Sequence, residues 1–173
     1  NNVYCQDNEI SWMNWEFGNE DRSLLAFVQQ LIFLRKAHPV FRRRRFFQGQ
    51  PIKGASVKDI LWLDPAATEM TEEEWVSSHA KTLGVLLSGE GIEELDARGE
   101  RILDDTFLVL MNAHHEPMPF TLPALASGTR WLAVFDTARD GGVKSQGRYQ
   151  ASGEYPLEGR SVVVLSQPNV NRP

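Results

Sequence analysis

The chain has 173 residues, 42% of them hydrophobic and 24% charged, which is typical of one globular domain, or of one domain with part of another. A net charge of -5 excludes a general nucleic-acid binder, because nonspecific affinity for phosphate backbones needs clustered Lys and Arg. The longest apolar stretch, Leu24 to Leu34, falls short of the roughly 18 residues that cross a bilayer, so we expect neither a nucleic acid nor a membrane as partner.

The first part of the chain predicts a loop and then a helix. Residues 1–15 are polar and aromatic without a regular period, which favours a loop. Apolar residues then recur at three- and four-residue spacing from Leu24 to Leu34, with Asp21 or Ser23 as the expected cap and Pro39 as the expected end.

The start of the chain also bears on the compartment. It opens on Asn1 without an initiator Met or a signal-peptide pattern, which we interpret as a piece of a longer protein. The lone Cys5 can form no internal disulfide, which is compatible with a reducing compartment, and we expect a cytoplasmic location.

Beyond Gly49 the pattern changes to short apolar runs separated by turn residues, as in an all-β sandwich or barrel. A sandwich is the simplest arrangement. Between the first two runs, Thr71 followed by three glutamates resembles a helix start, and Trp75 could then pack inward. We expect strands at 60–63, 82–88, 107–112, 119–122, 130–136 and 161–166.

The string Asn1–Trp12 (NNVYCQDNEISW) is long and specific, and further strings occur at 34–41, 58–63, 104–107, 112–114 and 160–165. Together they resemble the C-terminal portion of bacterial glycogen-debranching enzymes of the isoamylase type, in the α-amylase superfamily. The first string is similar to the loop that follows the eighth barrel strand of that family. The resemblance covers essentially the whole chain.

The resemblance implies a mainly β fold in two parts. Residues 1–47 would be the last loop and helix of a TIM-type (β/α)8 barrel, and residues 48–173 a C-terminal antiparallel β-sandwich. The implied parent protein is a glycoside hydrolase that cleaves α-1,6-glucosidic branch linkages. Its partners would be an α-glucan (glycogen, limit dextrin or maltooligosaccharide) and the catalytic barrel of the same protein.

The same resemblance implies that this chain holds no catalytic residue. Glycoside hydrolysis uses two carboxyl groups across the scissile bond, and the carboxylates of this family lie on earlier barrel strands. We therefore expect the chain alone to be inactive, to need no cofactor, and to support and frame the barrel. Two alternatives stay open: a stand-alone carbohydrate-binding module, or a structural module that self-associates through its exposed helix.

Substrate contact is expected chiefly in the first loop, because barrel active sites are built from the loops that follow the strands. Sugar recognition needs polar groups for hydroxyls and aromatic faces for the rings. The alternative is that Trp12 and Trp15 pack beneath the loop while Asp7 and Asn8 only form a turn. By resemblance, the residues lining the glucose subsites would be Tyr4, Gln6, Asp7, Asn8 and Trp12.

Other charged clusters have structural interpretations. Asp104-Asp105 should cap or form a turn, because adjacent strand residues point to opposite faces. Arg42–Arg45 should pair with a helix dipole, join the two parts of the chain or stay solvated, and Glu93-Glu94 should form a solvated face. His114 and His115 should point to opposite faces as neighbouring strand residues, and no third His or Cys lies at a recognisable spacing, so we expect no metal.

The aromatic residues of the second part divide into two groups. Trp62 and Trp131 lie in apolar runs and should be buried. Tyr149 and Tyr155 lie in a segment rich in Gly and Ser, where exposure is easier, and could contact sugar.

Overall fold

The chain is mainly antiparallel β, in a computed structural model that describes residues 5–51, 58–77, 80–125, 130–139 and 147–172. The helices are α1 (Asn19–Ala37), the 3-10 helix η1 (Pro39–Arg42) and α2 (Glu72–Trp75). The larger sheet has six strands in the order β1 (Ile60–Leu63), β2 (Thr82–Leu87), β3 (Thr106–Asn112), β8 (Ser161–Gln167), β5 (Arg130–Asp136) and β6 (Arg148–Gln150). The smaller sheet pairs β4 (Met118–Thr121) with β7 (Glu154–Leu157).

The predicted strands are confirmed to within one residue at each end, whereas β6 and β7 were missed. The helix cap was predicted wrongly. α1 already begins at Asn19, and the Gly18 amide donates to the Asp21 carboxylate at 2.9 Å, so Asp21 closes the first turn from inside the helix. The start of α2 is confirmed, because Thr71 and Glu74 exchange hydrogen bonds as a capping box.

The main core lies between the two sheets. Leu108 and Leu110 on β3 pack with Phe120 of β4 and Leu157 of β7, and all four are fully buried. Trp131 is buried there as predicted, and its indole Nε1 donates to the Pro123 carbonyl at 2.9 Å. This pairing satisfies the one polar atom of a large buried ring.

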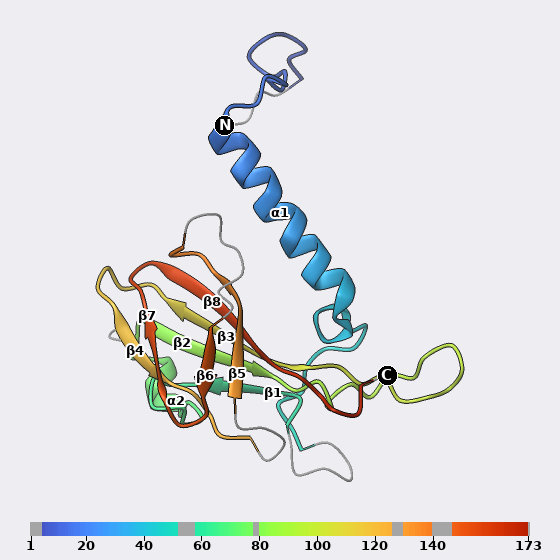
Figure 1. The fold of residues 1–173 in the computed structure, drawn as a ribbon, viewed down its shortest axis with the longest axis vertical. Coiled ribbons are helices and arrows are strands. Elements are labelled where there is room, and N and C mark those ends of the chain that lie inside the picture. The colour runs from blue at the N-terminus through green and yellow to red at the C-terminus, as the bar shows by residue number, and fades with distance from the viewer. Residues whose placement is uncertain (1–4, 52–57, 78–79, 126–129, 140–146, 173) are drawn as a thin grey trace.

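A second core covers the opposite face of the six-stranded sheet. Phe107 and Phe135 point to this side and pack against Phe27 and Leu34 of α1 and Val40 of η1. The rings of Phe27 and Phe135 lie 5.0 Å apart. In Figure 1, the C-terminal end of α1 lies against the sandwich, and the N-terminal loop lies at the other end of the helix, away from the sandwich. Among the described residues, no helix has the length and apolarity that crossing a membrane requires.

Three aromatic predictions are wrong, those for Trp62, Trp75 and Tyr155. Trp62 is 38% exposed, because the strand alternation turns Leu61 and Leu63 toward the main core and Trp62 away from it. Trp75 does not pack inward; it is 50% exposed and meets Trp62 edge to face at 5.5 Å. Tyr155 is 1% exposed, since β7 turns it into the main core, whereas Tyr149 is half-buried beside it.

Candidate functional site

The loop before α1 folds on itself through short polar contacts. Trp12 Nε1 donates to Asp7 Oδ1 at 2.7 Å, and the Ser11 hydroxyl donates to the Gln6 carbonyl at 2.7 Å. The Asn8 side chain accepts from the Ile10 amide at 3.1 Å, as in an Asx turn. The structure thus brings Gln6, Asp7, Asn8 and Trp12 together in one turn.

The side chains of this loop face solvent. The alternative, in which the loop tryptophans pack beneath the loop, is not found, because Trp12 is 63% exposed and Trp15 is also exposed. Asn8 does form the turn that the structural alternative proposed. Tyr4, the remaining predicted subsite residue, lies outside the described residues. The described part therefore offers amide and carboxylate oxygens beside one accessible indole face.

A buried charged cluster fixes the base of α1 to the sandwich. The Asp104 side chain is fully buried and accepts from the Val40 amide at 3.0 Å, which caps η1. His38 Nδ1 lies 2.8 Å from the other carboxylate oxygen of Asp104. Arg172 reaches Asp104 and Asp105 at 3.2 Å each and donates to the Ala37 carbonyl at 2.9 Å.

The expectation that Asp104 caps is confirmed, but its partners were not foreseen. His38 lies 66 residues before Asp104 in the chain, and Arg172 lies close to the C-terminal end. No local sequence pattern links positions that are so far apart. A carboxylate with this many donors is stable in the interior. The cluster joins α1, η1, the entry to β3 and the residues after β8.

The basic run makes specific ion pairs with acidic residues later in the chain. Arg43 is buried, pairs with Asp59 at 3.1 Å and lies over the Phe47 ring at 4.4 Å. Glu94 accepts from the Arg44 and Arg45 amides, so its expected solvated position is wrong. The hydrogen bond from the Arg44 amide holds the pKa of Glu94 below its ordinary value.

Among the residues that the structure describes, two clusters bring potential metal ligands within 4.8 Å of one another. In the first, His38 with Asp104 and Asp105, the Arg172 guanidinium supplies the positive charge. In the second, the predicted divergence of the histidine rings is wrong, because His114 and His115 lie in a bend after β3 with ring centroids 4.3 Å apart. His114 Nδ1 accepts from the Glu116 amide, so Nε2 carries the proton of the neutral ring.

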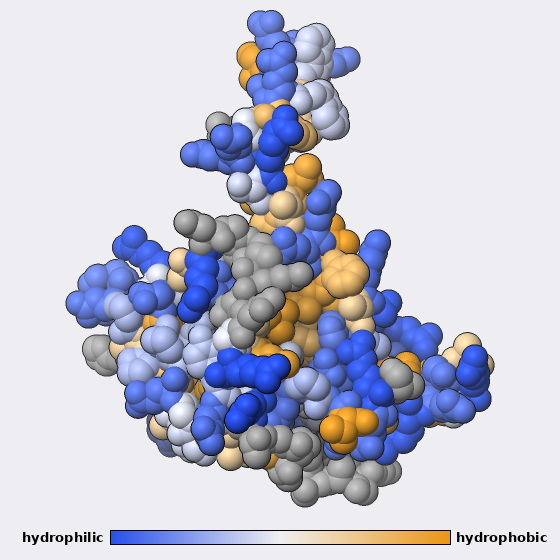
Figure 2. All heavy atoms as spheres, in the orientation of Figure 1, coloured by the Kyte–Doolittle hydropathy of each residue, from blue (hydrophilic) through white to orange (hydrophobic). Residues whose placement is uncertain are grey.

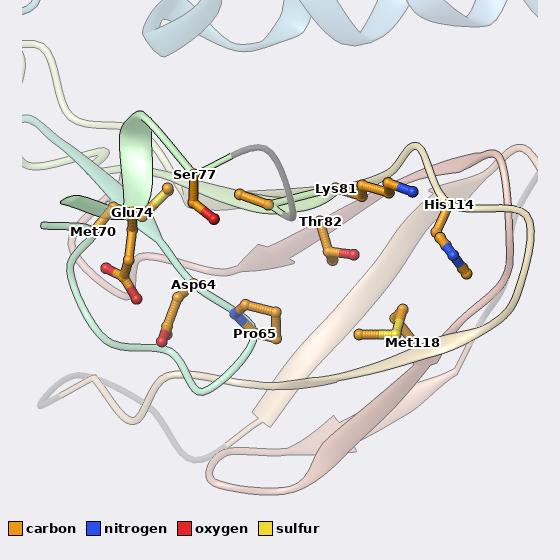
Figure 3. A pocket seen from close by; sticks show the side chains of 10 residues that line it. Asp64, Pro65, Met70, Glu74, Ser77, Lys81, Thr82, His114 and Met118 are labelled. Atoms are coloured by element: carbon orange, nitrogen blue, oxygen red, sulfur yellow. The ribbon is translucent and has the colours of Figure 1, made fainter. Parts of the chain in front are cut away.

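A pocket of about 470 Å³ opens beside the start of β2. Figure 3 shows Asp64 and Glu74 on one side and Lys81 and His114 on the other. Pro65, Met70 and Met118 complete its wall with apolar surface. Nothing in the sequence pattern had indicated this pocket, because its residues come from four separate segments.

α1 carries apolar side chains around its whole circumference. Phe27 and Leu34 pack on the sheet, whereas large residues on the other side are exposed, including Phe33 at 73%. Figure 2 shows apolar surface along the lower part of the helix and over the sheet beneath it. The exposed apolar arc consists of Leu24, Leu25, Val28, Leu31, Ile32 and Phe33. A helix of this kind is ordinarily buried on all sides.

These features define a β-sandwich domain with an N-terminal helix that presents an uncovered apolar arc. Residues 59–166 match the family described as isoamylase, C-terminal, and the chain belongs to that family. A glycogen operon protein GlgX homologue of Mycobacterium tuberculosis is 48% identical over 138 residues, which cover 79% of this chain and 19% of that protein. The isoamylase of Pseudomonas amyloderamosa is 25% identical over 137 residues, covering 79% of this chain and 16% of its own length.

Among solved structures, the type I pullulanase of Bacillus subtilis, complexed with maltose, matches with a TM-score of 0.55 at 17% identity. The match covers 92% of this chain and 18% of the pullulanase. This likeness supports the fold alone. The chain spans about a fifth of the length of the curated relatives that it matches.

Proposed function

We propose that this chain is the C-terminal part of a glycogen-debranching glycoside hydrolase that cleaves α-1,6-glucosidic linkages of glycogen or limit dextrin. In this proposal residues 1–47 complete the catalytic barrel, residues 48–173 form the sandwich that supports it, and the catalytic carboxylates lie elsewhere in the protein. The family membership and the names of the relatives support it.

The observation that carries the proposal is the exposed apolar arc of α1. Its residues would rest against neighbouring barrel helices, while Phe27 and Leu34 hold the opposite side to the sandwich. The buried Asp104 cluster then sets the direction in which α1 leaves the sandwich. The sandwich would thereby be fixed rigidly against the barrel and support it.

The loop at the far end of α1 is the proposed substrate contact. Asp7 keeps one carboxylate oxygen beyond its bond to Trp12, and the exposed indole offers a face to a pyranose ring. Tyr4, Gln6 and Asn8 would add hydroxyl-binding groups next to them. A loop at this position reaches the barrel mouth only when the barrel is present.

A chimera tests the proposal. This chain replaces the matching segment of the Mycobacterium tuberculosis GlgX homologue, and release of linear chains is measured from branched limit dextrin and from linear maltoheptaose. The chimera should act on the branched substrate only, the chain alone on neither, and Trp12→Ala should raise the KM of the chimera. A folded chimera without debranching activity, or hydrolysis by the chain alone, would refute the proposal.

A further inference from the structure

The proposed barrel contact accounts for the apolar surfaces on one side of the sandwich. Ile60 packs against the second core, on the side of the sheet that α1 covers, and the alternation of β1 places Trp62 on that same side. The Trp62 and Trp75 pair is therefore an extension of the surface that α1 occupies. Thr82, by contrast, alternates with Leu83 on β2 and shares the side of Leu86, which faces the main core.

The pocket beside Thr82 consequently opens from the edge of the space between the two sheets, away from α1. Its carboxylates face cationic groups across apolar surface. Figure 3 shows these two polar sides clearly. Neither the barrel contact nor the N-terminal loop uses any residue of this pocket.

Hydrogen bonds hold the two carboxylates of the pocket in place, and each still has an oxygen that can accept from a ligand. Asp64 Oδ1 accepts from the Thr68 amide at 2.7 Å, and Glu74 Oε2 accepts from the Thr71 amide at 2.8 Å. Each carboxylate keeps a second oxygen as an acceptor. Across the pocket, no salt bridge to a described residue engages Lys81, and His114 keeps its Nε2–H as a donor.

The charge balance selects the class of ligand. Two carboxylates against one ammonium and one imidazole give the pocket no net positive charge, which disfavours a phosphate or another anion. A neutral polyol suits both sides, because each hydroxyl can donate to a carboxylate and accept from an ammonium. The C–H faces of a sugar ring would cover Pro65, Met70 and Met118, and about 470 Å³ accommodates one or two glucose units.

We propose that this pocket binds the end of an α-1,4-glucan chain, as a second glucan contact separate from the N-terminal loop. The ligand class rests on the proposed function, in which α-glucan is the substrate. Figure 1 places the loop and α2, which lines the pocket, at opposite ends of the molecule. Two such contacts on one polymer raise the effective concentration of branch points near the barrel.

Two variants test the pocket directly in the full chain. Lys81→Met removes the ammonium and keeps the stem, and Ala80→Trp fills the opening from an exposed position. Affinity is measured by electrophoresis in gels containing glycogen and by calorimetry with maltoheptaose. Each variant should weaken binding about tenfold or more. For Lys81→Met this is the loss expected for a hydrogen bond to a charged group, and for Ala80→Trp the indole occupies the space of the sugar.

Glu72→Gln is the matched control, because Glu72 lies in α2 beside Glu74 but does not line the pocket. It should bind as the unchanged chain does, and thermal unfolding checks that all variants fold. Equal binding by all variants, loss of binding only in Trp75→Ala, or absence of binding by the unchanged chain would overturn the inference. So would binding of glycylglycine, a zwitterion, in place of maltoheptaose.

The two proposals fail in different ways. If the chimera debranches limit dextrin and glucan binding ignores Lys81→Met and Ala80→Trp, only the pocket inference is wrong. If the chimera is folded but inactive while the chain still binds maltoheptaose through the pocket, the proposed debranching function is wrong and the pocket remains.

Discussion

Tyr155 is the residue whose environment differs most from the sequence expectation. Its hydroxyl donates to Asp136 Oδ2 at 2.8 Å, and burial, followed by this bond to a carboxylate, raises its pKa far above the usual range. Because the folded state favours the protonated phenol, Tyr155 stabilises the fold fully below pH 10 or so. That contribution is lost as the pH rises above the pKa of the unfolded residue, about 10.

Tyr155→Phe should therefore have two effects. It should lower the free energy of unfolding at neutral pH by about 1.5–3 kcal/mol, as expected for a bond to a charged group. Asp136 still accepts from Arg139 and from the Ala138 amide, which keeps the loss within that range. The fall in stability between pH 9 and 11 should also be shallower than in the parent, as measured by urea unfolding across pH. An unchanged alkaline slope would contradict the assignment.

Asp104 links the residue scale to the elements around it. Asp104→Ala leaves the Val40 amide and His38 without their acceptor inside the structure, so it should cost about 3–5 kcal/mol. Asp105→Ala, which removes a more exposed carboxylate of the same cluster, should cost less. Urea unfolding compares the two, and amide exchange at Val40 should accelerate in the Asp104 variant alone. Equal losses would mean that burial of Asp104 is not decisive.

At the scale of elements, Gly84 lies where the two sheets are in close contact. A Cβ there would lie 2.5 Å from Cζ of the buried Phe120 ring and 3.3 Å from Leu63 Cβ. Gly84→Ala should cost about 1–3 kcal/mol through overpacking. Adding Phe120→Leu should recover part of that loss, so the double variant should be more stable than additivity predicts. Strict additivity in urea unfolding would place the strain elsewhere.

The same scale separates what the sequence could predict from what it could not. Long apolar runs such as that of β5 can be recognised in the sequence because buried strands need apolar residues, and the predicted bounds of β5 match the observed ones. β6 has only three residues, and β7 has four with Pro156 among them. Whether such short segments form strands depends on the strands they pair with rather than on their own residue pattern. The loop residues were proposed from a specific string in the sequence, whereas the pocket and the Asp104 cluster depend on contacts between distant segments.

For the molecule as a whole, the decisive feature is a helix with apolar residues on every side. Phe27 and Leu34 are covered by the sandwich, but the arc that includes Leu25 and Phe33 faces solvent in this chain. Apolar surface of this extent favours association with another surface. In the proposed enzyme that surface is the barrel. In the chain alone, a second copy can provide it.

The chain alone should therefore self-associate at micromolar concentrations, and Leu25→Glu should shift it toward the monomer. Leu25 is 45% exposed, so the new carboxylate stays solvated in the monomer but would be buried without a partner in an interface. Ser23→Glu adds the same charge two residues away, on the side of the helix that faces the packed residues, and serves as the control. Light scattering measures the mass of each. If both variants associate as the parent does, the arc is not the contact surface; if Leu25→Glu in the chimera also lowers the yield of folded enzyme, the same arc meets the barrel.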